Sequence, residues 1–538
     1  MRKYLTILII VLLALMLLPS KNLDAADSRT VLIGKLPYAI TSTFSSNNLL
    51  LVGTTNGFFI SEDYGKHFYE RDNGLGDFYI TGVIYIDKKI FLGTQNAGLY
   101  ISNDFGKSWQ SQMSKLNCPT ISSISVKDNV IYVTSLCTGF HYSTDFGKTW
   151  IVRNGGLPTL RTTAFIKTPE GRCFLGTNQF GLFYSDTLGE TCVWDKFFSP
   201  YTITSISYVN STLVIGTNEG IFTGDIRNDH FKKLGFIGGS PYIEKVLNVN
   251  GDAIVAVSGF GLFASNNGKD FYKFGSDTFS DVRTISFDGN NLYVGTNDGE
   301  LYKIDLSLPY LVAPHKVTMG SVQKGKSLSG VMRVFNIGKG TLSGTVKSPY
   351  FIKFSKTKFI QNETLDFTID TSTLSEGEYT EMITLSSNGG DRNAYISFVV
   401  QKPSSVILKL KIGSNVAFIN GQSYYLDAPP FIVKSAGRTV VPVRFISEAF
   451  GAKVQWDGAS RKVTIKKAPT EHHPPILIEL WIGEKSVKVN LKNEVIDVAP
   501  LIVPPGRTML PLRFIAEAFG SSVKWNPITR EITIIYTP

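Results

Sequence analysis

The stretch "FLGTQNAGLYISNDFGKSW", from Phe91 to Trp109, decides how most of this 538-residue chain folds. A short apolar run reaches a turn at Gly98, an aromatic-rich run follows, and a second turn contains Asp104 and Gly106. Short apolar runs separated by glycine turns predict β-strands joined by hairpins. The acid, glycine and tryptophan of the second turn could belong to a catalytic site or to a structural turn, and the rest of the chain helps to distinguish these roles.

The same plan recurs along residues 28–305 at a nearly constant spacing. The glycine of the first turn repeats every 38 to 42 residues, at Gly57, Gly98, Gly139, Gly181, Gly220, Gly261 and Gly299. Each unit also has a strand pattern before and after this core, as in "TISSISVKDNVIYVTS" and "KTWIVRNG". Four short strands in about 40 residues are typical of a β-propeller blade. The repeats therefore predict a mainly β chain with a seven-bladed β-propeller over residues 27–309.

The two ends of the repeat predict how the ring closes. The last unit, "VRTISFDGNNLYVGTNDGELYKID", runs into Pro309 without a fourth strand. Near the N-terminus, "RTVLIGKLPYAITS" aligns with "WQSQMSKLNCPTISS", in which a fourth strand leads into the next blade. We therefore expect residues 29–35 to form the outer strand of the seventh blade, which would remove a free sheet edge.

The turn "SNDFGKSW" recurs as "STDFGKTW" 41 residues later and as "SEDYGKHF" 41 residues earlier. Decayed copies begin at Ser185 and Ser265. The motif resembles the Asp-box of sialidase-like (BNR-type) propellers, in which the box lies on the face away from the active site. Its Ser and Asp side chains can bond turn N–H groups, and its Gly can adopt positive φ. We therefore predict a structural role for Asp63, Gly65, Asp104, Gly106, Trp109, Asp145, Gly147 and Trp150.

The resemblance to sialidases does not extend to catalytic residues. A sialidase-like site implies an arginine cluster, a tyrosine nucleophile and an acidic partner, but the arginines of the repeat do not recur at matching blade positions. A xyloglucanase-like enzyme needs two carboxylates facing each other across a cleft. The sequence therefore favours a binding protein without a cofactor, and a glycoside hydrolase acting at the propeller rim is the alternative.

The segments that enter each first strand carry most of the candidate ligand-binding residues. These segments and the turns between second and third strands should share one rim of the ring. Aromatic side chains there could stack on sugar rings or hold a peptide, and the alternative is that they pack between blades. The candidates are Tyr38, Phe78, Tyr79, Arg161, Tyr201, Tyr242 and Phe279.

Four cysteines fit an oxidising compartment. Cys118 and Cys137 should lie on the same rim of one blade, and Cys173 and Cys192 on the opposite rim of the next. This placement predicts Cys118–Cys137 and Cys173–Cys192 disulfides, and free buried thiols are the alternative. Metal binding is not expected, because no histidine accompanies them.

Residues 310–402 change to alternating apolar and polar strands, as in "TLDFTIDTSTLSEGEYTEMITLSSNGG". About seven strands in this length favour an immunoglobulin-like β-sandwich. The segment resembles the Ig-like modules of bacterial surface proteins, which implies a spacer or, second, an adhesion module.

Residues 405–538 contain a tandem repeat, 405–467 and 475–538. "VRFISEAFG" and "LRFIAEAFG" predict short helices between strands, each ending at a glycine, and Trp456 matches Trp525 at a distance of 69 residues. This α+β module resembles the copper amine oxidase N-terminal-like stalk domain. In those oxidases copper is bound by a separate catalytic domain.

No copper is expected in the stalk module. The adjacent His472 and His473 of "APTEHHPP" cannot close a metal site alone. The matching Arg438 and Arg507 are expected to bond a neighbouring loop, and glycan binding is the alternative.

The start of the chain, "MRKYLTILIIVLLALMLLPSKNLDAADS", has a basic end, a short apolar run and small residues, which predict a signal peptide over residues 1–26. The alternative is an uncleaved anchor. The net charge of +10 is spread along the chain, so nucleic acid is not an expected partner. We expect a secreted or cell-wall-associated protein, without a transmembrane segment after cleavage, that binds a protein or polysaccharide of the cell envelope.

Overall fold

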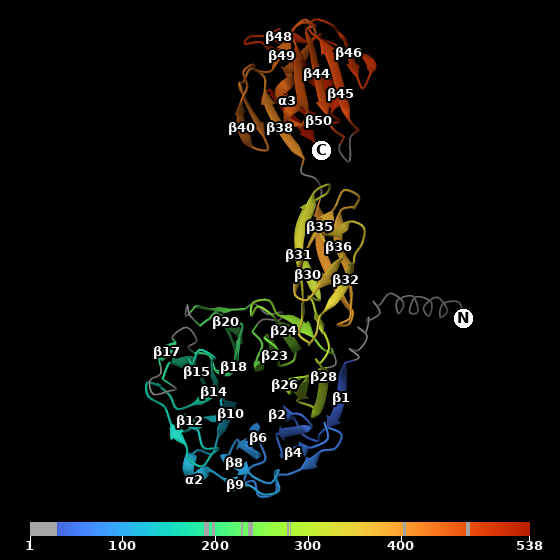
Figure 1. Ribbon diagram of the computed structural model, residues 1–538. Coiled ribbons are helices and arrows are strands. Elements are labelled where there is room, and N and C mark those ends of the chain that lie inside the picture. The colour runs from blue at the N-terminus through green and yellow to red at the C-terminus, as the bar shows by residue number, and fades with distance from the viewer. Residues whose placement is uncertain are drawn as a thin grey trace, which may run out of the picture.

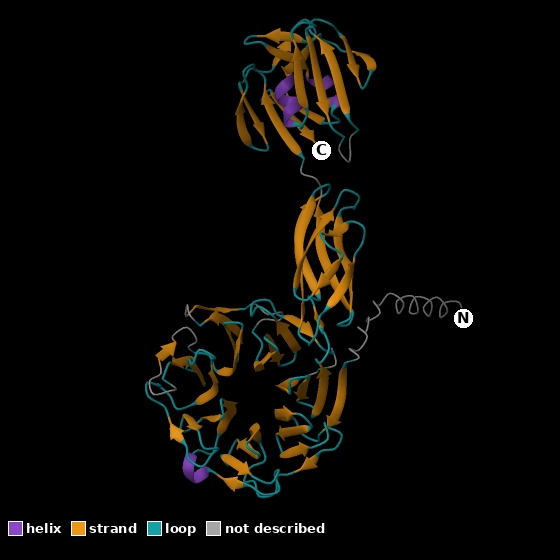
Figure 2. Cartoon of the chain, viewed as in Figure 1, coloured by secondary structure: helices purple, strands orange, loops and turns teal. Residues whose placement is uncertain are grey.

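The computed structural model describes residues 29–187, 193–195, 200–226, 230–234, 240–276, 279, 281–401, 405–469 and 474–537. The predicted signal peptide, Cys192, His472 and His473 lie outside these residues. The described chain is built almost entirely of β-strands, with a few short helices (Figures 1 and 2). The mainly β fold predicted from the repeats is therefore confirmed.

The first part of the described chain forms seven four-stranded antiparallel sheets arranged in a ring (Figure 2). The first three sheets contain β2 (Ile40–Ser46), β3 (Leu49–Thr54), β4 (Gly57–Ser61), β5 (Tyr69–Glu70); β6 (Ile80–Ile86), β7 (Lys89–Thr94), β8 (Leu99–Ser102), β9 (Gln110–Ser111); and β10 (Ile121–Lys127), β11 (Val130–Ser135), β12 (Phe140–Ser143), β13 (Ile151–Val152). The next three contain β14 (Thr162–Lys167), β15 (Cys173–Thr177), β16 (Leu182–Ser185), β17 (Val193–Asp195); β18 (Ile203–Val209), β19 (Thr212–Thr217), β20 (Gly220–Asp225), β21 (His230–Lys233); and β22 (Ile243–Val249), β23 (Asp252–Val257), β24 (Gly261–Ser265), β25 (Tyr272–Phe274).

The seventh sheet joins the two ends of the ring. It contains β26 (Val282–Phe287), β27 (Asn291–Thr296), β28 (Glu300–Asp305) and, as its outer strand, β1 (Thr30–Lys35). Strand β1 pairs antiparallel with β28 from Thr30 opposite Ile304 to Lys35 opposite Glu300. The predicted closing strand is thus present, and first strands of neighbouring blades contact each other all around the ring.

The box turns bond to their own backbone in the same way in three blades. Ser102 Oγ accepts the N–H of Gly106 at 2.8 Å and donates to Asp104 Oδ1 at 2.8 Å. The Ser108 hydroxyl and N–H donate to the same carboxylate at 2.6 and 2.9 Å, and these bonds followed by that of Ser102 lower the pKa of Asp104 to about 2. Gly106 has a φ of +79°, which an L side chain adopts with strain. Equivalent bonds surround Asp63 and Asp145.

The aromatic residue that closes the box packs against the preceding blade. Trp109 Nε1 donates to the carbonyl of Arg71 at 2.8 Å, and its ring lies edge-on to Phe58 at 5.5 Å. Trp150 packs in the same manner against the core that contains Phe91. The box geometry is therefore that of a hairpin fastened to the next blade.

A disulfide joins Cys118 and Cys137, as predicted, with a Cα–Cα distance of 5.6 Å. It links the helix-containing loop, α2 (Met113–Leu116), to the turn between the second and third strands of the next blade. Cys173 is buried at the start of β15, and its predicted partner lies outside the described residues.

Residues 311–401 form a two-sheet sandwich with nine strands, where the sequence predicts about seven. One sheet contains β29 (Leu311–Val312), β31 (Ser327–Asn336), β35 (Glu363–Asp370) and β33 (Ile352–Phe354). The other contains β30 (Lys316–Gln323), β37 (Arg392–Gln401), β36 (Gly377–Ser387), β32 (Ser343–Lys347) and β34 (Lys358–Ile360).

The sandwich shares a hydrophobic core with the last two blades. Tyr310, Val312 and Phe335 are almost fully buried together with Phe274 and Ile304 of the ring. The apolar cluster is continuous, so the sandwich is packed onto the propeller over an extended surface.

The stalk module interleaves its two repeats. One sheet contains β40 (Gln422–Tyr425), β39 (Val416–Ile419), β38 (Val406–Lys411), β51 (Glu531–Tyr536) and β50 (Ser522–Asn526). Another contains β43 (Lys453–Asp457), β44 (Lys462–Lys467), β45 (Ile476–Trp481), β46 (Ser486–Val489) and β47 (Lys492–Val495). A third contains β41 (Phe431–Val433), β42 (Arg438–Pro442), β49 (Arg507–Pro511) and β48 (Leu501–Val503). Each sheet takes strands from both repeats, so neither repeat is complete alone.

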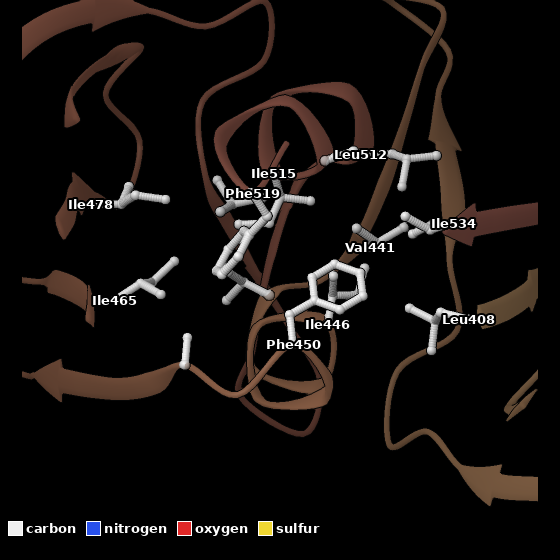
Figure 3. Close-up of a cluster of buried hydrophobic side chains, with 14 of the residues drawn as sticks. Leu408, Val441, Ile446, Phe450, Ile465, Ile478, Leu512, Ile515, Phe519 and Ile534 are labelled. Carbon is white, nitrogen blue, oxygen red and sulfur yellow. The ribbon is translucent and has the colours of Figure 1, made fainter. Parts of the chain in front are cut away.

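The two helices of the stalk, α3 (Val443–Ala449) and α4 (Leu512–Ala518), lie between the sheets and fill one core (Figure 3). Phe450 and Phe519, one from each repeat, approach to 5.6 Å between ring centroids. Arg438 bonds Asp497 at 2.5 Å and Arg507 bonds Asp427, so each arginine reaches a loop of the other repeat. This agrees with the expected structural role of both arginines.

We expect Ser102→Ala to lower the free energy of unfolding by about 1–3 kcal/mol, because the buried N–H of Gly106 loses its acceptor. Urea unfolding followed by intrinsic fluorescence measures this change. Ser108→Ala is the matched control, since Ser108 is exposed and its N–H bond to Asp104 remains. Equal effects of the two substitutions would contradict the prediction.

Candidate functional site

One face of the propeller is defined by a hydrogen bond that recurs in every blade. The first residue after the second strand donates its N–H to the carbonyl of a residue just before the first strand, as in Asn178 to Arg161 at 2.9 Å and Ser258 to Tyr242 at 3.1 Å. The same bond holds the five other described blades. We call this side the entry face, and the side with the box turns and the turns between first and second strands the box face.

The predicted rim residues divide into exposed and packed ones. Phe78 and Tyr242 are each 45% exposed, and Arg161 is also exposed. Tyr79 is half-buried and acts electrostatically on Tyr242, although the two tyrosines come from the second and sixth blades. These four residues gather at the entry side of the ring.

The other three rim candidates pack between blades. Tyr38 and Tyr201 are half-buried, and the Tyr201 ring lies 5.1 Å from that of Phe222. Phe279 was predicted to line the rim but is only 5% exposed, because it packs edge-on against Tyr302 at 5.0 Å. The entry position alone does not determine exposure.

Three further apolar side chains on the entry face escape the sequence-based prediction. Phe180 and Phe260, in turns between second and third strands, are 42% and 37% exposed. Leu160, which precedes Arg161, is 44% exposed. With Phe78 and Tyr242 they give this face five exposed large apolar side chains, contributed by three blades.

A second signal comes from a bulge that every first strand contains. In all seven described blades the ladder shifts register next to the second residue of this strand. Bulges re-aim side chains, and they are common beside functional sites. In five blades the bulged residue is a small hydroxyl residue, and the set is Thr41, Thr81, Ser122, Thr163 and Thr204.

The small hydroxyl residues mainly join neighbouring blades. Thr41 donates to the carbonyl of Ile80 at 2.5 Å, and Thr204 donates to that of Ile243 at 2.5 Å. The sixth and seventh blades carry Glu244 and Arg283 at this position instead. The fold needs only a short hydroxyl side chain here, so two large charged side chains indicate another role.

Glu244 and Arg283 face each other at the entry end of the ring. Arg283 Nη1 lies 3.5 Å from Glu244 Oε1, and their side chains are 40% and 12% exposed. Arg283 also donates through Nε and Nη2 to Asn297 Oδ1 at 3.2 and 3.0 Å, which fixes the guanidinium. The arginine therefore keeps much of its surface open while its position is set by the ring.

Two more charged groups surround this pair. Asp281 Oδ1 accepts the Ser258 hydroxyl and the Gly259 N–H, both at 3.1 Å. Burial raises the pKa of Glu244 to about 7, Arg283 opposes this shift, and Asp281 adds to it. Lys245 follows on the strand, is half-buried, and has its pKa lowered by burial. The carboxyl of Glu244 can therefore bind or release a proton near neutral pH.

A cleft of about 500 Å³ lies at the box-face mouth of the ring, at the ends of the first strands. Its polar side chains are occupied by one another. Tyr208 donates to Glu170 at 2.7 Å, and Lys127 and Lys167 both lie 3.9 Å from Asp128. This pairing favours the entry face as the better candidate site.

Across the described parts of the chain, no three of the His, Cys, Asp and Glu side chains gather closely enough to hold a metal ion. Within the same residues, none of the helices has the length and apolar character that crossing a bilayer requires.

We expect the free energy of unfolding to fall as pH rises from about 4.5 to 7, since the unfolded chain loses the Glu244 proton first, at its ordinary pKa of 4.5. Glu244→Gln should make this decrease shallower. Urea unfolding at a series of pH values measures both profiles. Parallel profiles for the two proteins would show that Glu244 does not titrate in this range.

Comparison with solved structures finds three similar propeller-containing folds. YCF48 from Cyanidioschyzon merolae has a TM-score of 0.42 at 13% identity, with 52% of this chain and 99% of that chain covered. The extracellular domains of the putative systems BT3049 and BT4673 from B. thetaiotaomicron both have TM-scores of 0.44, at 13% and 12% identity. They cover 85% and 96% of this chain, and 64% and 74% of their own.

Curated protein sequences include no match to this chain. One family model matches the C-terminal part, over residues 393–465 and 470–534, and its description is "Copper amine oxidase N-terminal domain". The second segment starts close to the predicted second repeat, and the first begins inside β37 of the sandwich. The stalk module is thus similar to the N-terminal domain of copper amine oxidases.

Proposed function

We propose that this chain is a secreted or cell-envelope binding protein whose propeller recognises a protein or a glycan on its entry face. The sandwich serves as a spacer, and the stalk module attaches the propeller to the envelope or to a partner. The observation that carries the proposal is the replacement of the small hydroxyl residues by Glu244 and Arg283 at the entry face.

The exposed apolar residues of the entry face support recognition of a ligand. Tyr, Trp and Arg are enriched among residues that dominate binding energy, and aromatic rings stack on sugars and peptides alike. Phe78 and Tyr242 expose nearly half of their surface, although their equivalents Tyr38 and Tyr201 are packed between blades. Exposure at only some of the equivalent positions favours a binding role over a packing role.

The position of the sandwich also supports this face. Lys339 bonds Asn290 at 2.7 Å, and Ile337 accepts a bond from Asn250 at 3.3 Å. Asn250 and Asn290 lie in turns of the box face, so the spacer contacts that side of the ring. A ligand can then approach the entry face without meeting these sandwich contacts.

We expect Tyr242→Ala and Phe78→Ala each to weaken ligand binding by about tenfold or more, as is typical of a central aromatic contact. The ligand is first identified on glycan and envelope-peptide arrays with the intact chain, and titration calorimetry then measures each variant. Tyr350→Ala is the control, because Tyr350 is 73% exposed and lies on the sandwich. Unchanged affinity in both propeller variants would place the site elsewhere.

The second candidate function is a glycoside hydrolase, and it is favoured by one observation. Glu244, with its pKa raised to about 7, lies near Asp281, and such a pair of carboxyl groups could supply an acid and a base. Both groups also have structural partners, which favours binding. Release of reducing sugar that Glu244→Gln abolishes would support the hydrolase, and binding without release would support the binding protein.

A further inference from the structure

A second cleft, also of about 500 Å³, lies where the sandwich meets the sixth blade. Its walls are formed by side chains and backbone of the turns around Asn210, Asn250 and Asn266 of the ring and by Asn336 and Gln361 of the sandwich. Every side chain that lines it is polar, and none carries a positive charge. The cleft lies on the box face and is separate from the entry face.

Asp252 is the one ionisable side chain that lines this cleft. It begins β23, opposite Val249, and is only 7% exposed. Within the described residues its carboxylate has neither a hydrogen bond nor an ion pair, and burial raises its pKa to about 7. A buried carboxylate without a partner is costly, and such groups normally pair or coordinate a metal.

The nearest cationic side chains of the sandwich are committed to other groups. Arg333 pairs with Asp270 at 2.9 Å, and Lys339 bonds Asn290 at 2.7 Å. No positive charge of the protein therefore compensates Asp252. The blade position itself does not require an acid, since its equivalents are Leu49 in the first blade and Thr212 in the fifth.

Amide oxygens accompany this carboxylate. Asn250 donates its amide nitrogen to Ile337, and Asn210 donates its nitrogen to Gly251. Each amide oxygen then points away from its own donor bond. Asn210 Oδ1 lies close to Gly251, at 3.7 Å from the position that a Cβ would take there. A carboxylate with neutral amide oxygens in a wet, irregular cleft matches the ligand preference of calcium.

We propose that this cleft binds a hydrated calcium ion through the carboxylate of Asp252 and the side-chain oxygens of Asn210 and Asn250, with water completing the coordination. A single carboxylate predicts a weak site, with a Kd of about 0.1–1 mM, as in extracellular modules. Asn250 already bonds the sandwich, so the bound ion would tighten the contact between sandwich and propeller.

Titration calorimetry and thermal unfolding of the intact three-module chain, first stripped with chelator, test this site with calcium chloride alone. We expect saturable binding in the millimolar range or below and an unfolding temperature that rises with calcium. Asp252→Asn should weaken binding at least about tenfold, while the calcium-free protein keeps or gains stability because the buried acid is gone.

Asp128→Asn is the matched control, because Asp128 lies on the same face but is largely exposed. It should leave calcium binding unchanged. Absence of calcium binding in the unsubstituted protein at 10-fold the expected Kd, about 10 mM, would overturn the proposal. So would binding that Asp252→Asn leaves intact, or an equal loss in both variants.

Discussion

The pairing of β1 with β28 is the interaction on which the propeller depends. Without it the seventh sheet would end at β28, and its open edge would expose unpaired N–H and C=O groups. Six register pairs or neighbours across this seam, from Thr30 to Lys35, bring residues about 270 positions apart into one sheet. All other blades are formed locally, so the closed ring and the constant order around it follow from this single long-range contact.

Closure also separates two faces with different tasks. On the box face, serine and aspartate side chains bond their own turns, and the decayed copy around Asp270 receives Arg333 of the sandwich. On the entry face, the recurring backbone bond leaves side chains such as Phe78 and Tyr242 exposed. The acids of the box are thus consumed by structure, and the charged groups that depart from the repeat, Glu244 and Arg283, lie on the other side.

Much of this organisation could be predicted from the repeat. The spacing of glycines predicts seven blades, the orphan strand predicts the seam, and shared rims predict the Cys118–Cys137 bond. Aligning the first strands would also have found Glu244 and Arg283, because they stand where five blades have Thr or Ser. Other features depend on contacts far apart in the chain. Equivalent entry positions place Phe279 inside and Phe78 outside, and β38 pairs with β51 rather than within its own repeat.

The attachment of the sandwich to the seventh blade has a mechanical consequence. The chain leaves β28 and enters the sandwich within a few residues, and Arg29, just before β1, bonds the carbonyls of Pro309 and Asn388. Tension transmitted through the C-terminal modules therefore reaches β28, which is flanked by β27 and β1, and acts along its strand direction. Such a load must shear two ladders at once instead of peeling one edge, so the seam that closes the ring is also the place where the ring resists being pulled.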